Sequence, residues 1–377
     1  MYLFVALVTI AVPILMVWRA GISTSPDFIY RYDPGANELL RSMGLAQLPP
    51  QDLSPYAWAR IGYMVFVAAC YLVWGIGNAT ALIYTQMAIV WVVQPLMFHI
   101  LLHTTGRAWF SFLAMGVWLA FFDAYQWNTW ALPDALFRVV VLAVFFVSLR
   151  LWEQGRQRAF AVTVVGGTLL ASTLRVEAVL YAMPALWLVA RGFGRSSQWV
   201  RVVVPVTALG GLILITPLLR QLGAYLDGWF SQGTVFLSVD PIEGVSHVTP
   251  PVDPSIAARI GFVLKVVGLR GWYSITPLPA YWSHAHQYFY AAFMIPFYAL
   301  TLAAMPTAIR RRWHLFLICL WIFIASVILR MMTHVDSPMR YAYTPQVFLF
   351  FCAVWGTGLW LRGSDAGIRA KIEPSTR

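Results

Sequence analysis

The chain has 377 residues, of which 60% are hydrophobic and 11% charged, and its mean hydropathy is +0.69. A water-soluble fold of this composition would lack the polar surface to cover itself, so the sequence predicts an integral membrane protein. The formal net charge of +11 comes from short basic clusters between apolar segments. Such clusters are typical of membrane topology signals and do not indicate a nucleic-acid partner.

Basic residues gather in short connections between the apolar segments. These connections, with the tail, hold 14 of the 26 Lys and Arg residues but three of the 15 acidic residues. Because Lys and Arg are enriched in cytoplasmic loops, we expect these connections and the tail, about 362–377, in the cytoplasm. The sequence then predicts an all-α polytopic bundle, a single membrane domain over residues 1–377. Its ten crossings are expected at about 2–18, 81–102, 108–123, 135–151, 159–174, 176–190, 201–219, 287–306, 314–331 and 341–361.

The first of these segments is expected to be a retained anchor. No basic stretch precedes its apolar run, and no small-residue cleavage site follows it, as a signal peptide would require.

Two further apolar segments do not fit this count. A crossing at Ile61 to Gly77 would place the Arg107 loop outside, so this segment is expected to lie in the interface or to re-enter. Lys265 and Arg270 interrupt the second segment, around Ile260 to Trp272, which favours an amphipathic helix on the outer surface. If both segments cross the membrane, the number of crossings becomes twelve.

Two outer loops are long on either count, at about 19–58 and 220–286, and loops of this length are commonly functional. The first contains SPDFIYRYDPGANELLRSMG, in which Asp27 and Asp33 lie among aromatic rings beside Arg31. A carboxylate in this place is either a general base or a solvated loop charge. Pro34-Gly35 after Asp33 predicts a turn.

Charged residues also occur near the outer ends of later spans, where insertion costs about 2.5–3.5 kcal/mol per charge. FFDAYQWNTWALPDALFRVV places Asp123 and Asp134 at the two ends of a loop. Asp134 is either a site residue or an ordinary acid at a helix N-terminus, favoured by the macrodipole. In TLRVEAVLYAMPALW, Arg175 and Glu177 lie between two spans, where the plain interpretation is an ion pair within the loop.

Arg340 opens the last span in THVDSPMRYAYTPQ, beside Tyr341. Its guanidinium is suited to phosphate at an interface, although an anchor in the aromatic belt would look the same. His284 and His286 diverge on a helix and have no third ligand close in sequence, so no metal site is predicted.

Taken together, these segments resemble a bacterial GT-C type glycosyltransferase, the polytopic class that includes protein O-mannosyltransferases, aminoarabinose transferases and lipopolysaccharide-modifying sugar transferases. YDPGANELLRSMG is similar to the family's first-loop pattern, an Asp followed by a short helix. PYAWARIGYMVFVAACYLVWGIG is similar to the juxtamembrane segment that follows it. LPDALFRVV resembles the stretch with the second functional acid, TLRVEAVLYAMPALW the element that ends in proline, and MRYAYTPQ the late Arg-Tyr element.

The resemblance implies a GT-C fold with outer juxtamembrane helices, a sugar donor linked to polyprenyl phosphate, and a lipid or glycan acceptor at the outer face of the cytoplasmic membrane. Asp33, with Asp27 as the alternative base, would take a proton from the acceptor hydroxyl, with inversion at the sugar. Arg340 and Arg175 would hold the departing phosphate, and Asp134 would orient acceptor, sugar or a cation. A divalent cation is compatible with these residues, but their spacing does not require one.

Two other functions share parts of this pattern. A transporter or flippase for a lipid-linked saccharide would carry polar residues at mid-membrane depth, broken helices or an internal repeat. The predicted span interiors mostly lack charge, which favours an enzyme. A polymerase or ligase of surface polysaccharide would share the outer-face chemistry, for which Asp123, Glu177 and Tyr341 are further candidate residues. The charge asymmetry predicts that Arg156 and Arg311 lie in the cytoplasm and that Asp33 and His247 lie outside.

Overall fold

A computed structural model gives the structure of much of the chain. It describes isolated positions between 3 and 18, and then 21–50, 60–121, 129–175, 177–192, 230, 235–240, 244–252, 255–276, 284–311, 313–333 and 338–361, without the side chains of 186–192, 236–240, 244–247, 332–333, 338–343 and 359–361. The chain divides into two compact units, residues 1–196 with 364–377, and residues 197–363. The predicted crossing at 201–219 and the tail lie outside the described residues.

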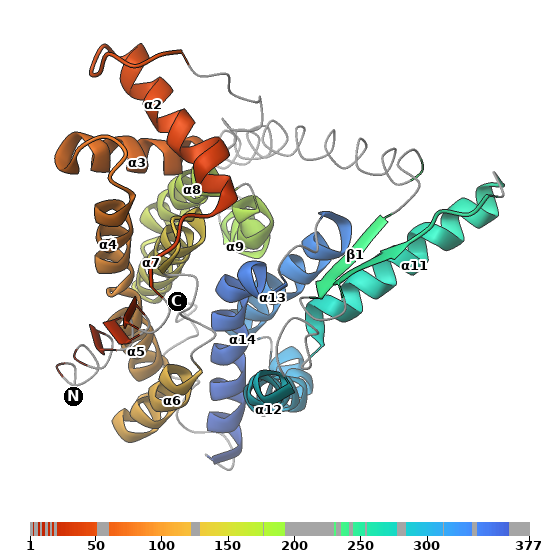
Figure 1. Ribbon diagram of the computed structural model, residues 1–377. Helices are drawn as coiled ribbons and strands as arrows, with labels where there is room; N and C mark the ends of the chain where they lie inside the picture. Colours follow the sequence, from red (N-terminus) through yellow and green to blue (C-terminus); the bar gives the residue numbers. More distant parts are fainter. Residues whose placement is uncertain are drawn as a thin grey trace. The chain divides into compact units, whose positions relative to one another are not determined.

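The first unit is built from helices (Figure 1). In chain order its elements are η1 (Phe28–Tyr32), α2 (Asp33–Ser42), α3 (Ile61–Trp74), α4 (Ala79–Val90), α5 (Val93–Thr105), α6 (Ala108–Ala120), α7 (Pro133–Glu153), α8 (Gln157–Leu174) and α9 (Ala178–Gly192). The long loop after the N-terminal segment contains a π-helical turn, η1, and a short helix, α2, which packs against the following helix, α3.

The predicted crossing at 81–102 is a helical segment with a break. Asn78 caps the N-terminus of helix α4: its side chain accepts a hydrogen bond from the Ala81 backbone N–H at 3.1 Å. The helix ends at Val90. Pro95 explains the break, because its ring opposes the carbonyl four residues earlier, at Trp91, and it has no N–H to donate. Helix α5 then ends at Gly106, whose φ of 66° is readily adopted by glycine.

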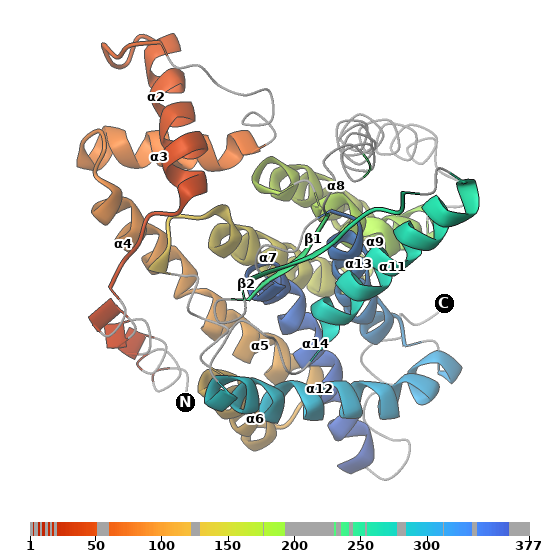
Figure 2. The ribbon, with the colours of Figure 1, turned by 45° about the vertical axis from the view of Figure 1, so that its right-hand side comes forward.

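Helices α7 and α8 form the main hairpin of the first unit and lie side by side in both ribbon views (Figures 1 and 2). Pro133 starts α7, where its missing N–H leaves no helical bond unmade. The two helices pack closely at Gly167, where a Cβ would lie 2.3 Å from a methyl carbon of Val144. A larger residue at this position would force the Val144 side chain or the helix to move.

The second unit combines long helices with a small antiparallel strand pair. Strand β1 (Val235–Asp240) pairs with β2 (Gly244–Val248) inside the long loop at 220–286, an addition to the all-α fold that the sequence predicts. The helices are α11 (Ile256–Ile275), α12 (His284–Arg310), α13 (His314–Thr333) and α14 (Pro338–Leu361). From Thr344 to Trp355 every residue of α14 is buried, so this helix forms the core of the unit between α12 and α13.

Four helical segments in the described part of the chain are long and apolar enough to cross a membrane. They are Ala79–Thr105, Pro133–Glu153, His284–Arg310 and His314–Met331, and each covers a crossing expected from the sequence. The helices Ile61–Trp74 and Ala108–Ala120 are apolar but shorter. A helical membrane protein therefore fits the structure, and the count of ten to twelve crossings stays a prediction.

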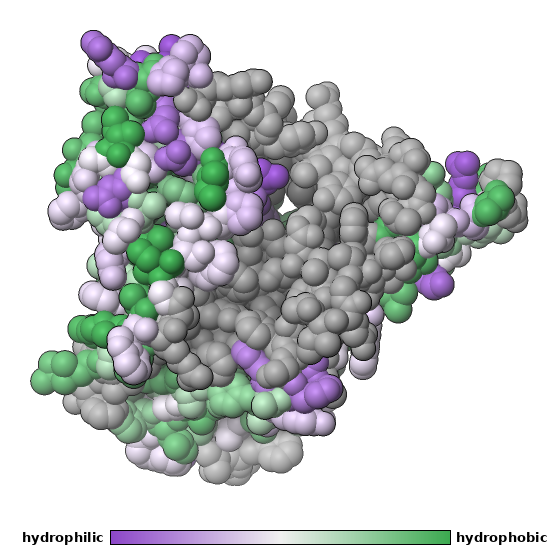
Figure 3. All heavy atoms as spheres, viewed as in Figure 1, coloured by the Kyte–Doolittle hydropathy of each residue, from purple (hydrophilic) through white to green (hydrophobic). Residues whose placement is uncertain are grey.

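Surface character differs along the first unit. Hydrophilic residues gather over α2, whereas hydrophobic residues cover much of the corner that contains α6 (Figure 3). The exposed large side chains of α6 are apolar: Trp109, Phe112, Leu113 and Val117. This contrast fits α2 as part of an extramembrane region and α6 as a lipid-facing helix.

Candidate functional site

Asp33 occupies the junction between η1 and α2. The five-residue π-helical turn ends at Tyr32, and α2 begins at Asp33 with Pro34 in its first turn. The sequence predicts a turn at Pro34-Gly35 and a short helix from Asn37, but the helix already starts at Asp33. This part of the prediction was wrong, because proline is readily accommodated in a first helical turn, where its missing N–H would have no partner.

The Asp33 carboxylate receives hydrogen bonds from two sides. Its Oδ1 accepts from the Tyr71 hydroxyl of α3. Its Oδ2 accepts from the Asn37 side-chain amide, one turn along α2, at 3.4 Å. Asp33 is half-buried, and an ionised carboxylate has about four acceptor positions, so acceptor capacity remains beside these two bonds.

Arg60, directly before α3, connects this region to a second charged cluster. Its guanidinium donates to the Tyr32 hydroxyl and lies 6.0 Å from the centre of the same ring. Its positive charge also acts on Glu177, which follows α8. Arg60 thus bonds to the first loop and acts electrostatically on the connection between α8 and α9.

The second cluster consists of Asp134, Arg175 and Glu177. Asp134 lies in the first turn of α7, and Arg175 ends α8. The Arg175 guanidinium contacts Asp134 Oδ1 through Nη1 and Glu177 Oε1 through Nε and Nη2. All three are deeply buried, with exposures of 2%, 6% and 6% in chain order. Charge-assisted bonds of this kind are what makes burial of three ionised groups tolerable.

Glu177 shows the electrostatic balance of this cluster. Burial by itself raises the pKa of its carboxyl, because the charged form loses water. The positive charges of Arg175 and, to a smaller extent, Arg60, with hydrogen bonds to the carboxylate, outweigh burial and lower this pKa below its ordinary value. Glu177 is therefore the ionised partner of Arg175.

The structure confirms both plain interpretations of these residues and adds a link between them. Arg175 and Glu177 form the ion pair expected within the loop, and Asp134 is the expected acid in a first helical turn. The bond between Asp134 and Arg175 joins residues 41 positions apart, which the sequence does not reveal. Because two carboxylates occupy the Arg175 guanidinium, its geometry favours a role in holding these acids over one in binding phosphate.

The remaining predicted residues are separate from this group or only partly described. Asp27 forms an ion pair with Arg31 at 3.1 Å on η1. Asp123 lies outside the described residues. Arg340 and Tyr341 belong to the first turns of α14 in the second unit, and their side chains lie outside the described part.

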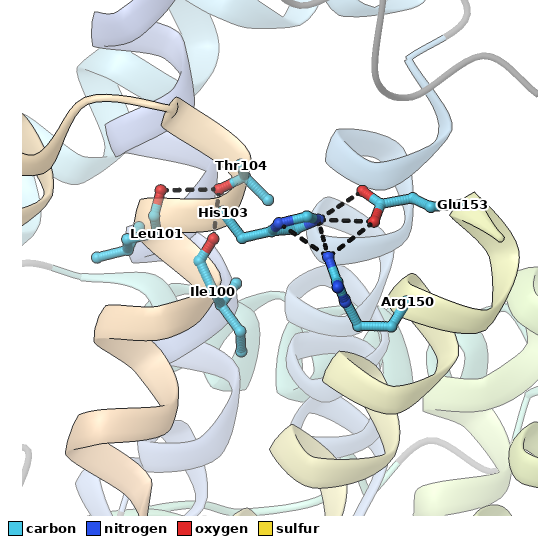
Figure 4. Close-up of polar contacts among 6 residues, drawn as sticks. All are labelled: Ile100, Leu101, His103, Thr104, Arg150 and Glu153. Atoms are coloured by element: carbon cyan, nitrogen blue, oxygen red, sulfur yellow. Dashed lines mark hydrogen bonds and ion pairs between the residues drawn. The ribbon is translucent and has the colours of Figure 1, made fainter.

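A different charged cluster marks the other end of α7. His103 of α5 lies between Glu153 and Arg150 of α7 (Figure 4). Its Nε2 is 2.6 Å from Glu153 Oε2, and its Nδ1 is 3.2 Å from Arg150 Nη1. The contact brings the basic turn after α5 and the basic turn after α7 to the same end of the unit, as the charge pattern predicts.

Sequence reasoning missed three side chains that shape the surroundings of Asp33: Asn37, Arg60 and Tyr71. A usable signal was present for the tyrosine. Tyr63, Val67 and Tyr71 recur every fourth residue on one face of an apolar helix, and a buried tyrosine hydroxyl usually has a hydrogen-bond partner.

Among the described residues, no three His, Cys, Asp or Glu side chains come together as a metal-binding group. No protein-family model, curated protein or solved structure matches the chain. The case for a function therefore depends on the residues themselves.

Proposed function

We propose that this chain is a glycosyltransferase that moves a sugar from a polyprenyl-phosphate-linked donor to a lipid or glycan acceptor at the outer face of the cytoplasmic membrane. The observation that supports it best is the Asp33 carboxylate. It is held by two donors, is half-buried and retains acceptor capacity, and it starts a short helix in a chain that also has apolar, membrane-length helices. These are properties of a general base that receives a substrate hydroxyl.

In the proposed reaction, the acceptor oxygen attacks the anomeric carbon of the sugar while Asp33 takes the hydroxyl proton. The new glycosidic bond forms as the bond between that carbon and the phosphate oxygen breaks, which inverts the configuration. The bonding electrons leave with the polyprenyl phosphate. Phosphate is a good leaving group without protonation, so this reaction does not require the second carboxylic acid that glycoside hydrolysis uses.

The other charged residues are given supporting roles in this proposal. Asp134, Arg175 and Glu177 form a buried cluster that fixes the ends of α7, α8 and α9. Arg60 connects that cluster to the loop that carries Asp33. Arg340 remains the proposed ligand of the donor phosphate, because a guanidinium can bind two phosphate oxygens at once.

The test is sugar transfer from a synthetic polyprenyl-phosphate donor by purified protein in detergent. Asp33→Asn keeps the size and polarity of the side chain but removes the proton acceptor, so turnover should fall by about 100- to 10,000-fold while donor binding survives. Asp27→Asn, in the same loop, is the matched control and should cost far less. A dead Asp27→Asn beside an active Asp33→Asn would transfer the role of base to Asp27. If both variants work at the wild-type rate, the proposed mechanism is wrong.

A further inference from the structure

The Tyr71 hydroxyl faces the Asp33 carboxylate across the contact between α3 and α2. Tyr71 is only 2% exposed and donates to Oδ1, while Asn37 donates to Oδ2 from the other side. A phenol has an ordinary pKa of about 10, so it keeps its proton at neutral pH and acts as the donor in this bond. The carboxylate is therefore held by one donor from its own helix and one from a different helix.

Close packing of the two helices makes this contact possible. A Cβ at Gly35 would lie 2.5 Å from the sulfur of Met64, which is fully buried in α3. A Cβ at this distance would force the Met64 side chain to move, so glycine lets α2 and α3 pack closely without that change. Asp33 is two residues before Gly35, and Tyr71 is two helical turns beyond Met64. The close packing at Gly35 therefore lies next to the contact between Asp33 and the tyrosine.

A hydrogen bond from Tyr71 constrains the geometry of a carboxylate base. It fixes the plane of the carboxylate, so that the remaining acceptor positions point in one direction. This orientation matters for a base, which must be aimed before an acceptor hydroxyl arrives.

We propose that Tyr71 is a positioning residue for Asp33: its hydroxyl, on a helix that packs against α2 at Gly35, orients the carboxylate for proton transfer. This inference rests on the proposed function of Asp33 as the base. Tyr71 acts through Asp33 and needs no contact with the substrate.

The experiment compares Tyr71→Phe with Tyr63→Phe by single-turnover sugar transfer, so that product release does not mask the chemical step. Tyr63 is a matched control on the same helix. It is also fully buried, and its hydroxyl donates at 3.0 Å to Gln86 and not to Asp33. Tyr71→Phe should lower the single-turnover rate about tenfold with the donor KM unchanged.

Tyr63→Phe should leave the single-turnover rate at the wild-type value. A second pair of variants covers the case in which Tyr71→Phe does not fold. Gly35→Ala retains the hydroxyl but crowds Met64, which is fully buried, and should also lower the single-turnover rate. Adding Met64→Ala to that variant removes the obstructing atoms and should restore the wild-type rate.

The outcomes separate this inference from the proposed function. If Asp33→Asn loses turnover but Tyr71→Phe has the same single-turnover rate as Tyr63→Phe, Asp33 is the base and Tyr71 does not position it. If Asp33→Asn retains full turnover, the proposed function itself fails. A rate loss in Tyr71→Phe that comes with a raised donor KM would also overturn the inference, since a purely structural defect would give that result.

Discussion

The guanidinium of Arg175 lies between two carboxylates in a deeply buried setting. Removing one partner from a buried ion pair typically destabilises a protein by about 3–5 kcal/mol, because the charge that remains is no longer compensated. We therefore expect Arg175→Ala to lower the free energy of unfolding by about this amount. The measurement is thermal unfolding of the purified variant in detergent.

Arg41→Ala is the control for this prediction. Arg41 also binds a carboxylate, that of Glu38, but the pair lies on the accessible side of α2. Its loss should leave the unfolding temperature almost unchanged, as for most exposed ion pairs. Equal unfolding temperatures for Arg175→Ala and the wild type would show that the cluster does not stabilise the unit.

Arg340→Lys tests the proposed phosphate ligand. The substitution keeps the charge but replaces a planar fork with a single ammonium, so donor KM should rise while the protein remains folded. Arg340→Ala should raise it further. Unchanged donor KM and kcat in both variants would identify Arg340 as an interfacial anchor with no part in donor binding.

At the same scale, the sequence predicts local contacts of the site but not distant ones. The ion pair of Arg175 with Glu177 needs only a two-residue separation and was predicted. The bond from Tyr71 to Asp33 spans 38 positions and depends on how closely one helix packs on another. Hydropathy and charge patterns carry no information on such a distance, so Tyr71 and Arg60 could not be assigned from them.

Helix packing in the first unit depends on small residues at defined places. In α8, Gly167 faces Val144 of α7, and a Cβ would lie 2.3 Å from its methyl carbon, whereas the neighbouring Gly166 has open space at the same position. Gly167→Ala should therefore lower stability by about 1–3 kcal/mol through overpacking. Gly166→Ala should be neutral or slightly stabilising, because alanine favours a helix over glycine.

Thermal unfolding of these two neighbouring variants compares the same chemical change in two environments. If they unfold at the same temperature, the close approach of α7 and α8 is not as the structure describes it. A Val144→Ala substitution added to Gly167→Ala should recover part of the loss, because it removes the atoms that the new methyl group meets.

Element boundaries show where sequence patterns are sufficient. The crossing expected at 135–151 coincides with α7, because a long apolar run with proline at its start has one plausible helical interpretation. The crossing expected at 81–102 contains the break at Trp91 and Val92 that Pro95 imposes, and hydropathy averages do not register such a break. The strand pair of the second unit was missed for a related reason, since it is short and lies in a long polar loop.

At the scale of the first unit, α7 connects two chemically different ends. Asp134 and Glu153 are 19 residues apart on this helix, which corresponds to about 29 Å at 1.5 Å per residue. The hydrocarbon core of a bilayer is about 30 Å thick. The cluster of Asp134, Arg175 and Glu177 and the cluster of His103, Arg150 and Glu153 are therefore separated by the distance that a membrane requires.

The charge pattern predicts the direction of this helix across a membrane. Arg150, Arg156 and Arg158 lie at or beyond its C-terminal end, and Lys and Arg favour the cytoplasmic side. We then expect the Asp33 region to face outward, because Arg60, which bonds to Tyr32, acts electrostatically on Glu177 near the opposite end of the helix. An outward-facing base is what a reaction at the outer face needs.

Cysteine labelling in intact cells or sealed right-side-out vesicles tests this orientation. Ser42→Cys reports on the end of α2, and Arg156→Cys on the turn after α7; both positions are exposed, whereas native Cys70, Cys319 and Cys352 are buried. A membrane-impermeant maleimide should label Ser42→Cys directly and Arg156→Cys only after the membrane is broken. The reverse pattern would place the Asp33 region in the cytoplasm and remove the outer-face reaction from consideration. Labelling of both before lysis would mean that α7 does not cross the membrane, and the separation of its two charged ends would then need another explanation.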